Sequence, residues 1–249
     1  MERIKHAIKS GLAHLGVEIH RRRPFGSDVF RDIRNILGDD SQMVAFDVGA
    51  NVGQTTLAFE REFRSARIHS FEPNPEAYAL LTKHVSGHRL ITTHPIALGS
   101  RCEDRAMHIT KSNLTSSLLP ISQTATRFLG DLVHEAGQAK VPVSSLDEFV
   151  AKENIGHVDL LKLDVQGFEI EVLRGAAVSL RNNHISTILT EVTFVKLYED
   201  QAYFHDVYGE LIRHNYQLVG LYHGDYRAGP YLAWCDALFV NPEAIKNRA

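Results

Sequence analysis

From residue 43 onward, short runs of apolar residues alternate with longer stretches in which apolar residues recur at helical spacing. The apolar runs predict strands at Met43–Val48, Arg67–Phe71, Leu90–Leu98, Val158–Leu163, His184–Val192, Tyr216–Tyr222 and Trp234–Val240. The helical periods predict helices at Gln54–Phe63, Pro75–Val85, Ser145–Lys152, Phe168–Arg174 and Tyr203–Asn215. Because strands that alternate with helices form βαβ units, we expect an α/β protein with a mostly parallel sheet covered on both faces.

The last two predicted strands break this alternation. Only the turn-rich segment His223–Pro230 lies between them, and it shows no helical period. A short connection of this kind joins antiparallel strands, so we expect one antiparallel strand at the end of the sheet. Ligands of such sheets bind beyond the carboxyl ends of the strands. The stretch from 101 to 140 is less regular.

The first 40 residues differ in character and are expected to form a helical appendage to a domain at 41–249. Apolar residues at 4, 8, 12 and 15 share one helical face, and a second helix is predicted at Asp28–Leu37, with Ser27 as its N-cap and Gly38 as its stop. Between them, Arg21–Arg23 could contact an anionic membrane surface or form a solvated edge. A short helix with one apolar face favours a lid, or an arm that forms a homo-oligomer, over membrane contact.

Composition excludes several classes of protein. The chain has 249 residues, of which 44% are hydrophobic and 23% charged, which is typical of a globular protein. The formal net charge of −3 gives no overall attraction to nucleic acid, so we expect no nucleic-acid partner. Two cysteines cannot build a disulfide framework or a four-cysteine zinc site. With no apolar run of bilayer length and no signal-peptide core, a reducing, cytoplasmic location is expected.

The sharpest local signal is the loop between the first strand and the first helix after it, Asp47-Val48-Gly49-Ala50-Asn51-Val52-Gly53. Gly49 permits a tight turn, Asn51 tolerates positive φ, and Gly53 permits close approach at the helix start. The spacing matches neither the dinucleotide fingerprint nor the P-loop. An acidic residue before the loop suits a cationic or amine-bearing ligand better than a phosphate. We therefore favour a ligand loop over a plain βα turn.

A second acidic residue, Glu72, follows the second strand in the sequence Phe71-Glu72-Pro73. A carboxylate at this place in a βαβ unit can accept hydrogen bonds from both hydroxyls of a ribose. Pro73 and Pro75 stiffen the turn that presents it. Together with the glycine loop, Glu72 predicts a nucleoside site rather than a solvent-facing side chain.

These two segments resemble the S-adenosylmethionine site of class I methyltransferases. Three further segments, His94–Gly99, Val143–Phe149 and Asp159–Ala176, resemble the FkbM family, with the likeness extending over about residues 43–242. The resemblance implies a Rossmann-like, seven-stranded sheet and methyl transfer from S-adenosyl-L-methionine to oxygen, often on a sugar or a natural-product hydroxyl. The chain departs from the family where Gln166 stands in place of a common glutamate, which argues against a catalytic carboxylate at 166.

The resemblance also implies roles for single residues. Those that would line the methionine end of the cofactor are Asp47, Gly49, Asn51 and Gly53. Glu72 would take the ribose, with Asn74 near it. Ala97 and Leu98 would border the adenine, and Asp164 would lie beside the methyl group.

Candidate catalytic residues follow from the need to activate a hydroxyl, which takes a general base or a cation. Asp164 and Glu191 each end a predicted strand at the ligand-bearing edge. One of them can act as base, or both can hold a divalent cation such as Mg²⁺. Alternatively, Asp164 only caps a helix and Glu191 only pairs with a basic residue. His223, expected in a loop over the acceptor, is a weaker candidate base.

The polar cluster of Asn113, Ser116 and Ser117 could bind a polyhydroxylated acceptor or close over the cofactor, and it could equally be an ordinary turn. The leading hypothesis is an O-methyltransferase that acts on a sugar, a glycan or a glycosylated natural product. The alternatives are methylation of a nitrogen or of a lipid or polyketide hydroxyl, and a non-catalytic nucleotide-binding module.

Overall fold

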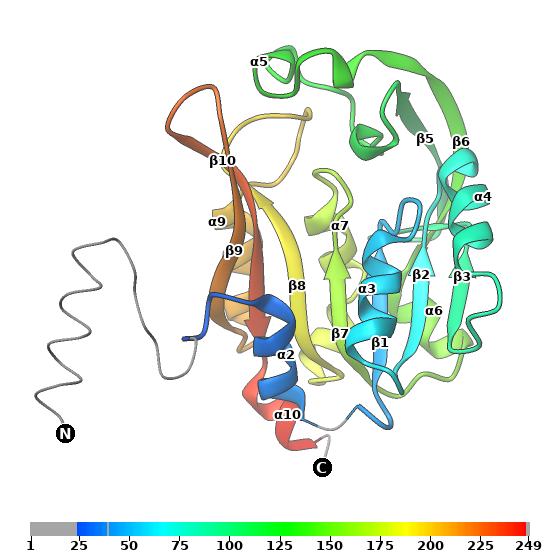
Figure 1. Ribbon diagram of the computed structural model, residues 1–249, viewed down its shortest axis with the longest axis vertical. Helices are drawn as coiled ribbons and strands as arrows, with labels where there is room; N and C mark the ends of the chain where they lie inside the picture. The colour runs from blue at the N-terminus through cyan, green and yellow to red at the C-terminus, as the bar shows by residue number, and fades with distance from the viewer. Residues whose placement is uncertain (1–23, 39, 248–249) are drawn as a thin grey trace, which may run out of the picture.

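A single seven-stranded sheet forms the centre of the computed structural model, which describes residues 24–38 and 40–247 (Figure 1). Its strands lie in the order β3-β2-β1-β7-β8-β10-β9. Their bounds are Val44–Val48 for β1, Arg67–Phe71 for β2, Ile91–His94 for β3, Val158–Leu163 for β7, Ile185–Thr193 for β8, Gln217–Arg227 for β9 and Tyr231–Val240 for β10. The predicted α/β fold is confirmed.

Strand direction also matches the prediction. β1 pairs in parallel with both β2 and β7, β2 with β3, and β7 with β8. β10 is antiparallel to both of its neighbours, β8 and β9. The hairpin that joins β9 to β10 is longer than expected and turns only at residues 228–230. His223 therefore lies inside β9, and its predicted place in a loop is wrong.

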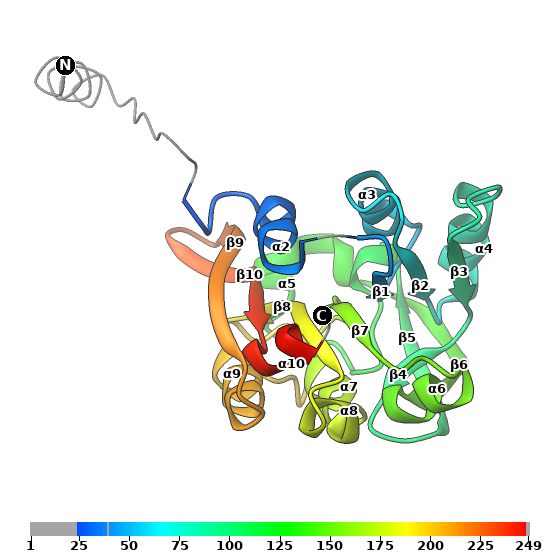
Figure 2. The ribbon, with the colours of Figure 1, turned by 90° about the horizontal axis from the view of Figure 1, so that it is seen from below.

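Helices cover both faces of the sheet (Figure 2). One face carries α2 (Val29–Leu37), α3 (Gln54–Glu62) and α4 (Pro75–His84). The other carries α6 (Leu146–Lys152), α7 (Glu169–Arg174), α8 (Ala177–Arg181) and α9 (Phe204–Arg213). The short helix α10 (Pro242–Asn247) follows β10 at the amino edge of the parallel strands. The fully buried strands β1 and β7 lie between these layers, as their near-continuous apolar sequences require.

A second, three-stranded sheet lies beside the first, in the order β4-β6-β5. Its strands are β4 (Ala97–Gly99), β5 (Glu103–Thr110) and β6 (Glu135–Ser145), and the short elements η1 (Asn113–Thr115), α5 (Thr126–Leu129) and η2 (Gly130–Val133) lie between β5 and β6. The single strand predicted at Leu90–Leu98 is wrong because the chain leaves the main sheet at Pro95. Residues after Pro95 pair with β6 instead.

The predicted N-terminal appendage is described only from residue 24, so its first helix and Arg21–Arg23 lie outside the described residues. Its second helix is α2, and Gly38 ends it as predicted. The N-cap is Asp28 rather than Ser27, because the Asp28 carboxylate accepts the backbone N–H of Arg31. Val29, Ile33 and Leu37 are buried against α3 and the sheet, so this helix packs as part of the main core.

Within residues 24–38 and 40–247, no helix combines the length and the apolar character needed to cross a bilayer.

Candidate active site

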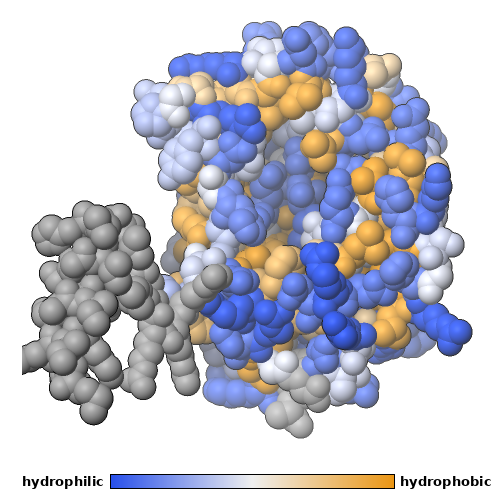
Figure 3. Space-filling model, viewed as in Figure 1, coloured by the Kyte–Doolittle hydropathy of each residue, from blue (hydrophilic) through white to orange (hydrophobic). Residues whose placement is uncertain are grey.

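A cavity of about 320 Å³ opens at the carboxyl ends of β1, β2 and β7. The segment between β5 and β6, green in Figure 1, arches over these strand ends. The molecular surface is hollowed there (Figure 3). Among the cavity's lining residues are six of the predicted cofactor residues, namely Gly49, Asn51, Glu72, Ala97, Leu98 and Asp164. The predicted edge of the sheet is therefore the edge that holds the cavity.

The glycine loop brings β1 close to the end of β7. Gly49 has φ of +80°, and a Cβ there would lie 1.9 Å from the backbone oxygen of Asp164. The backbone N–H of Asp164 donates in turn to Val48 O at 3.0 Å. Only glycine permits this approach, because any side chain would push the two strand ends apart. Gly49 thus holds Asp164 at the cavity wall.

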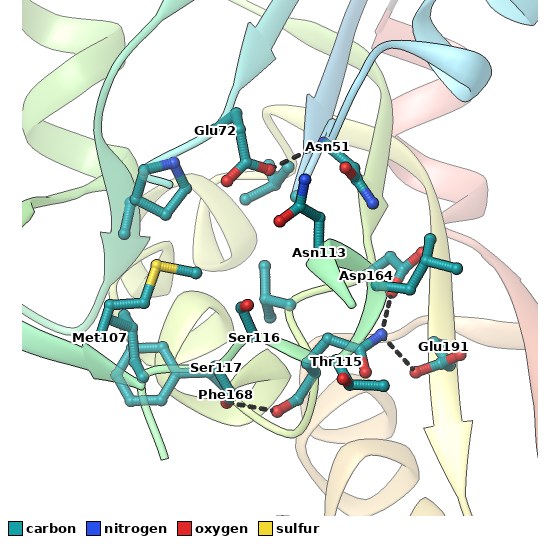
Figure 4. A pocket seen from close by; sticks show the side chains of 18 of the residues that line it. Asn51, Glu72, Met107, Asn113, Thr115, Ser116, Ser117, Asp164, Phe168 and Glu191 are labelled. Atoms are coloured by element: carbon teal, nitrogen blue, oxygen red, sulfur yellow. Dashed lines mark hydrogen bonds between the residues drawn. The ribbon is translucent and has the colours of Figure 1, made fainter. Parts of the chain in front are cut away.

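Glu72 is held rigidly at the tip of β2. Its Oε2 accepts the backbone N–H of Asn51 at 2.8 Å (Figure 4). Its Oε1 accepts the backbone N–H of Asn74 at 2.7 Å. The side chain is 5% exposed, and burial raises the pKa of Glu72 to about 7 despite these two hydrogen bonds. Each oxygen keeps a lone pair for a ligand in the cavity.

Three of the predicted cofactor residues support the loop from behind rather than line the cavity. Asp47 is fully buried and accepts the hydroxyl of Thr56 at 2.7 Å. Gly53 is the N-cap of α3, with φ of +96°, and Asn74 caps α4 by accepting the N–H of Glu76. Their proposed contact with the cofactor stays a prediction.

Lys162 is a residue that the sequence argument missed. Its ammonium lies 3.1 Å from Asp47 Oδ1, 3.5 Å from Asp164 Oδ2 and 3.3 Å from the carbonyl oxygen of Gly49. Burial alone would lower the pKa of Lys162, but the two carboxylates raise it above its usual value. A lysine in a strand that is buried along its whole length was the available signal.

Asp164 and Glu191 both line the cavity, as predicted. The side-chain amide of Gln166 lies between them, and its Nε2 is 2.8 Å from Asp164 Oδ1 and 3.4 Å from Glu191 Oε2 (Figure 4). A hydrogen-bond donor therefore takes the place that a shared cation would need. Among the described residues, no group of three or more histidine, cysteine, aspartate and glutamate side chains forms a candidate metal site. The structure gives no support to the predicted Mg²⁺ site.

His223 is not among the residues that line the cavity. Its imidazole is 65% exposed, and its Nδ1 lies 2.8 Å from Asp236 Oδ2. Loss of a general base lowers kcat by about 10²- to 10⁴-fold. Because His223 lies outside the cavity, we expect His223→Gln to change kcat by less than about threefold. Initial rates with the wild type and the variant check this. A loss of a hundredfold or more would return His223 to the catalytic group.

A large part of the remaining cavity wall comes from β5 and the segment between β5 and β6. Asn113, Ser116 and Ser117 of the predicted polar cluster all line it. Ser117 also donates its hydroxyl to the carbonyl of Gln166 at 2.7 Å, so it anchors the arch to the end of β7. Met107 and Phe168 add apolar walls beside Leu98, and neither was predicted. At the mouth, Arg227 lies over the ring of Trp234, 5.2 Å from its centroid.

One atom of the cavity wall points to a ligand. Asn51 Oδ1 is buried and has no hydrogen-bond partner in the structure. An acceptor without a partner costs free energy unless a ligand donates to it. With the fixed carboxylate of Glu72 and the apolar wall at Leu98, it fits a ligand that has an amino group, a diol and a flat ring. S-adenosylmethionine has all three.

Comparison with known proteins agrees with this geometry. A family model described as the methyltransferase FkbM domain matches residues 47–218. Methyltransferase 1 of Beauveria bassiana is 29% identical over 152 residues, which are 55% of this chain and 59% of that protein. The hexuronic acid methyltransferase AglP of Haloferax volcanii is 24% identical over 65% of this chain and 62% of its own length. The match thus spans about 60% of each of these two relatives.

Two further comparisons cover more of the chain. The 2-O-methyltransferase NoeI of Sinorhizobium fredii is 25% identical over 72% of this chain and 75% of its own length. Among solved structures, the methyltransferase domain of METTL16 superposes with a TM-score of 0.50 at 9% identity, over 86% of this chain and 66% of that one. At that identity the likeness shows a shared fold alone.

Proposed function

Because the chain belongs to the FkbM methyltransferase family, we propose that it transfers a methyl group from S-adenosylmethionine to a hydroxyl oxygen of a sugar, a glycan or a glycosylated small molecule. The observation that carries this proposal is the cavity itself. Glu72 and Asn51 offer acceptors for the polar groups of a nucleoside, and the Asp164 carboxylate lies at the same wall.

The proposed cofactor residues divide the cavity into parts. Glu72 would accept hydrogen bonds from the ribose hydroxyls, and Asn51 from the amino group of the methionine tail. Leu98, Met107 and Phe168 would enclose the adenine in apolar surface. S-adenosylmethionine supplies an already activated methyl group, so the protein has to align it with the acceptor and take up a proton.

Asp164 is the proposed general base. Its side chain is 38% exposed, so a bound acceptor can reach it, whereas Glu72 is occupied by backbone N–H groups. Asp164 takes the proton of the acceptor hydroxyl as the oxygen forms its bond to the methyl carbon and the bond from carbon to sulfur breaks. Glu191 lies on the neighbouring strand β8 and shares Gln166 with Asp164, which makes it the second candidate base.

The proposal that the acceptor is a sugar is supported by the names of two relatives and by the residues that line the cavity. Two relatives are named for a hexuronic acid and for 2-O-methylation. The lining of the cavity combines polar groups, among them the side-chain amide of Asn113, with the indole of Trp234. Polar groups of this kind bind ring hydroxyls, and an aromatic face stacks on the apolar face of a sugar.

The test has two stages. Calorimetry with S-adenosylmethionine and S-adenosylhomocysteine should show one site per chain. Mass spectrometry of a panel of free sugars, oligosaccharides, glycosylated natural products and polyketide alcohols should then show one acceptor class that gains a methylene. Binding with no methylated product on any member would favour the non-catalytic module. No binding of either nucleoside would refute the proposal.

The raised pKa of Glu72 predicts how cofactor affinity depends on pH. A ribose diol donates to the carboxylate, so the cofactor binds the deprotonated form and releases a proton as it binds. Since the pKa of free Glu72 is about 7, affinity should rise with pH up to about 7 and level off above it. One unit below that pKa, only about a tenth of the sites are ionised, so the Kd should be about tenfold higher.

Calorimetry at pH 6 and pH 8 with S-adenosylhomocysteine measures this dependence. Glu72→Gln should bind more weakly at pH 8 and lose the dependence, because the amide does not titrate. Exposed Glu76, which caps nothing with its side chain, gives the matched control Glu76→Gln. An unchanged pH dependence in Glu72→Gln would assign the titration to another group.

A further inference from the structure

Gln166 links four parts of the site, three through its side chain and one through its backbone. Its Nε2 donates to Asp164, which follows β7, and to Glu191 on β8. Its Oε1 accepts the hydroxyl of Tyr198 at 2.8 Å. Its backbone carbonyl accepts the hydroxyl of Ser117 from the arch over the cavity. No other described residue makes hydrogen bonds to both of these carboxylates.

The orientation of the amide follows from its partners. The carboxylate of Asp164 accepts from the amide and lies 3.5 Å from the Lys162 ammonium, so the –NH₂ end faces Asp164 and, beside it, Glu191. At the other end of the amide, Gln166 Oε1 lies 2.8 Å from the buried hydroxyl of Tyr198, which also has the carbonyl of Thr115 within reach at 3.1 Å. The backbone of Gln166 has φ of +56° and is followed by Gly167 at +94°, a sharp turn that aims the side chain back toward the end of β7.

The charges around this amide are mostly negative. The groups that face the pair from the surrounding elements are Lys162 on β7, Glu169 on α7, Asp236 on β10 and Tyr198 after β8. Burial and the nearby carboxylates of Asp164, Glu169 and Asp236 raise the pKa of Glu191 well above its usual value. Lys162 is committed to Asp47 and Asp164. Among the described residues, Gln166 donates the hydrogen bond that the Glu191 carboxylate accepts.

We propose that Gln166 is a positioning residue whose amide ties the carboxylates of Asp164 and Glu191 into one unit and favours their ionised form. The consequence for catalysis rests on the proposed function: the unit would present Asp164 to the acceptor hydroxyl ready to take a proton. Tyr198 supports this arrangement from the other end of the amide, because its hydroxyl is shorter to Gln166 Oε1, at 2.8 Å, than to the carbonyl of Thr115, at 3.1 Å.

The test follows the titration of the two carboxylates in the free protein, so it needs neither cofactor nor acceptor. Carbon-13 NMR of labelled side-chain carboxyls gives the apparent pKa values of the pair, with Asp164→Asn and Glu191→Gln to assign the signals. In Gln166→Met, which keeps the length of the side chain but cannot donate, the pair should titrate at least one pH unit higher than in the wild type. Tyr198→Phe should move it in the same direction by less.

Gln217→Met, at an exposed glutamine at the far end of β9, is the matched control and should leave the pair unchanged. Titration of the pair in Gln166→Met within 0.3 pH units of the wild type, roughly the precision of such measurements, would overturn the proposal. If Gln166→Met unfolds, Tyr198→Phe decides in its place, since it removes one hydroxyl and keeps the ring.

A second readout separates this inference from the proposed function. If methyl transfer is observed, the acid limb of the pH profile of kcat should move in Gln166→Met by the same interval as the NMR titration, with little change in the KM of the acceptor. A merely structural role would lower kcat at every pH alike, and that result would overturn the positioning role. A shifted titration in a protein without methyl transfer would support the tie between the carboxylates and refute the proposed activity.

Discussion

Asp164→Asn is expected to lower kcat by about 10²- to 10⁴-fold, because asparagine keeps the size of the side chain but cannot accept the proton of the acceptor hydroxyl. Asp164 is the accessible carboxylate at the end of β7, and Gly49 and Gln166 both fix its place. The affinity for S-adenosylhomocysteine should change much less, by about tenfold at most. Initial rates with the acceptor found by mass spectrometry and calorimetry with S-adenosylhomocysteine separate the two effects.

Asp131→Asn provides the matched control, since the Asp131 side chain is 99% exposed and is not among the residues that line the cavity. Its rate should equal that of the wild type. Glu191→Gln completes the comparison. A large loss in Glu191→Gln with a rate in Asp164→Asn within tenfold of the wild type would move the base to Glu191. Full activity in both variants would remove carboxylate base catalysis from the mechanism.

The main sheet and the cavity edge could be predicted because each leaves a local mark in the sequence. β1 and β7 are buried on both faces, so their sequences are almost wholly apolar and their lengths are short. Asp164 directly follows β7, and Glu72 directly follows β2, which pairs with β1. The carboxyl ends of parallel strands meet at one edge, so the order of the chain was enough to bring these two side chains together.

The sequence of the second sheet has no such local pattern. β5 and β6 bury only alternate or scattered positions, and β6 contains Pro142, which argues against an inner strand. The structure accommodates Pro142 because β4 pairs only with residues 143–145, just beyond it. Met107 and Ser116 reach the cavity through this sheet and its connections, so their partners depend on contacts that are distant in the sequence.

The contacts between side chains that are distant in the sequence could not be predicted either. Gln166 was visible only as a departure from a family pattern, and its link to Glu191 joins residues 25 positions apart. The pairing of His223 with Asp236 follows from the register of the β9–β10 hairpin, which no local pattern fixed. Asp47 has the sequence position of a ligand residue, yet its carboxylate accepts the hydroxyl of Thr56 and forms an ion pair with Lys162.

Lys162→Met is expected to destabilise the protein by about 3–5 kcal/mol, the cost of removing one partner from a buried ion pair. Methionine can fill the space of the lysine stem, so packing is largely kept. The loss falls on Asp47, which is fully buried and would lose the ammonium 3.1 Å away. Chemical denaturation of the wild type and the variant measures the difference in the free energy of unfolding.

Asp47→Asn combined with Lys162→Met distinguishes charge imbalance from lost packing. The double variant removes both charges of the buried pair, and asparagine can still accept the hydroxyl of Thr56. It should recover most of the stability that Lys162→Met loses, since no uncompensated charge remains at Asp47. Asp164 would still lack its contact with Lys162, but its side chain is 38% exposed and water can solvate it. A double variant as unstable as Lys162→Met would show that the lysine acts through its stem and its contact with Gly49, so the buried charge pair would not be what joins β1 to β7.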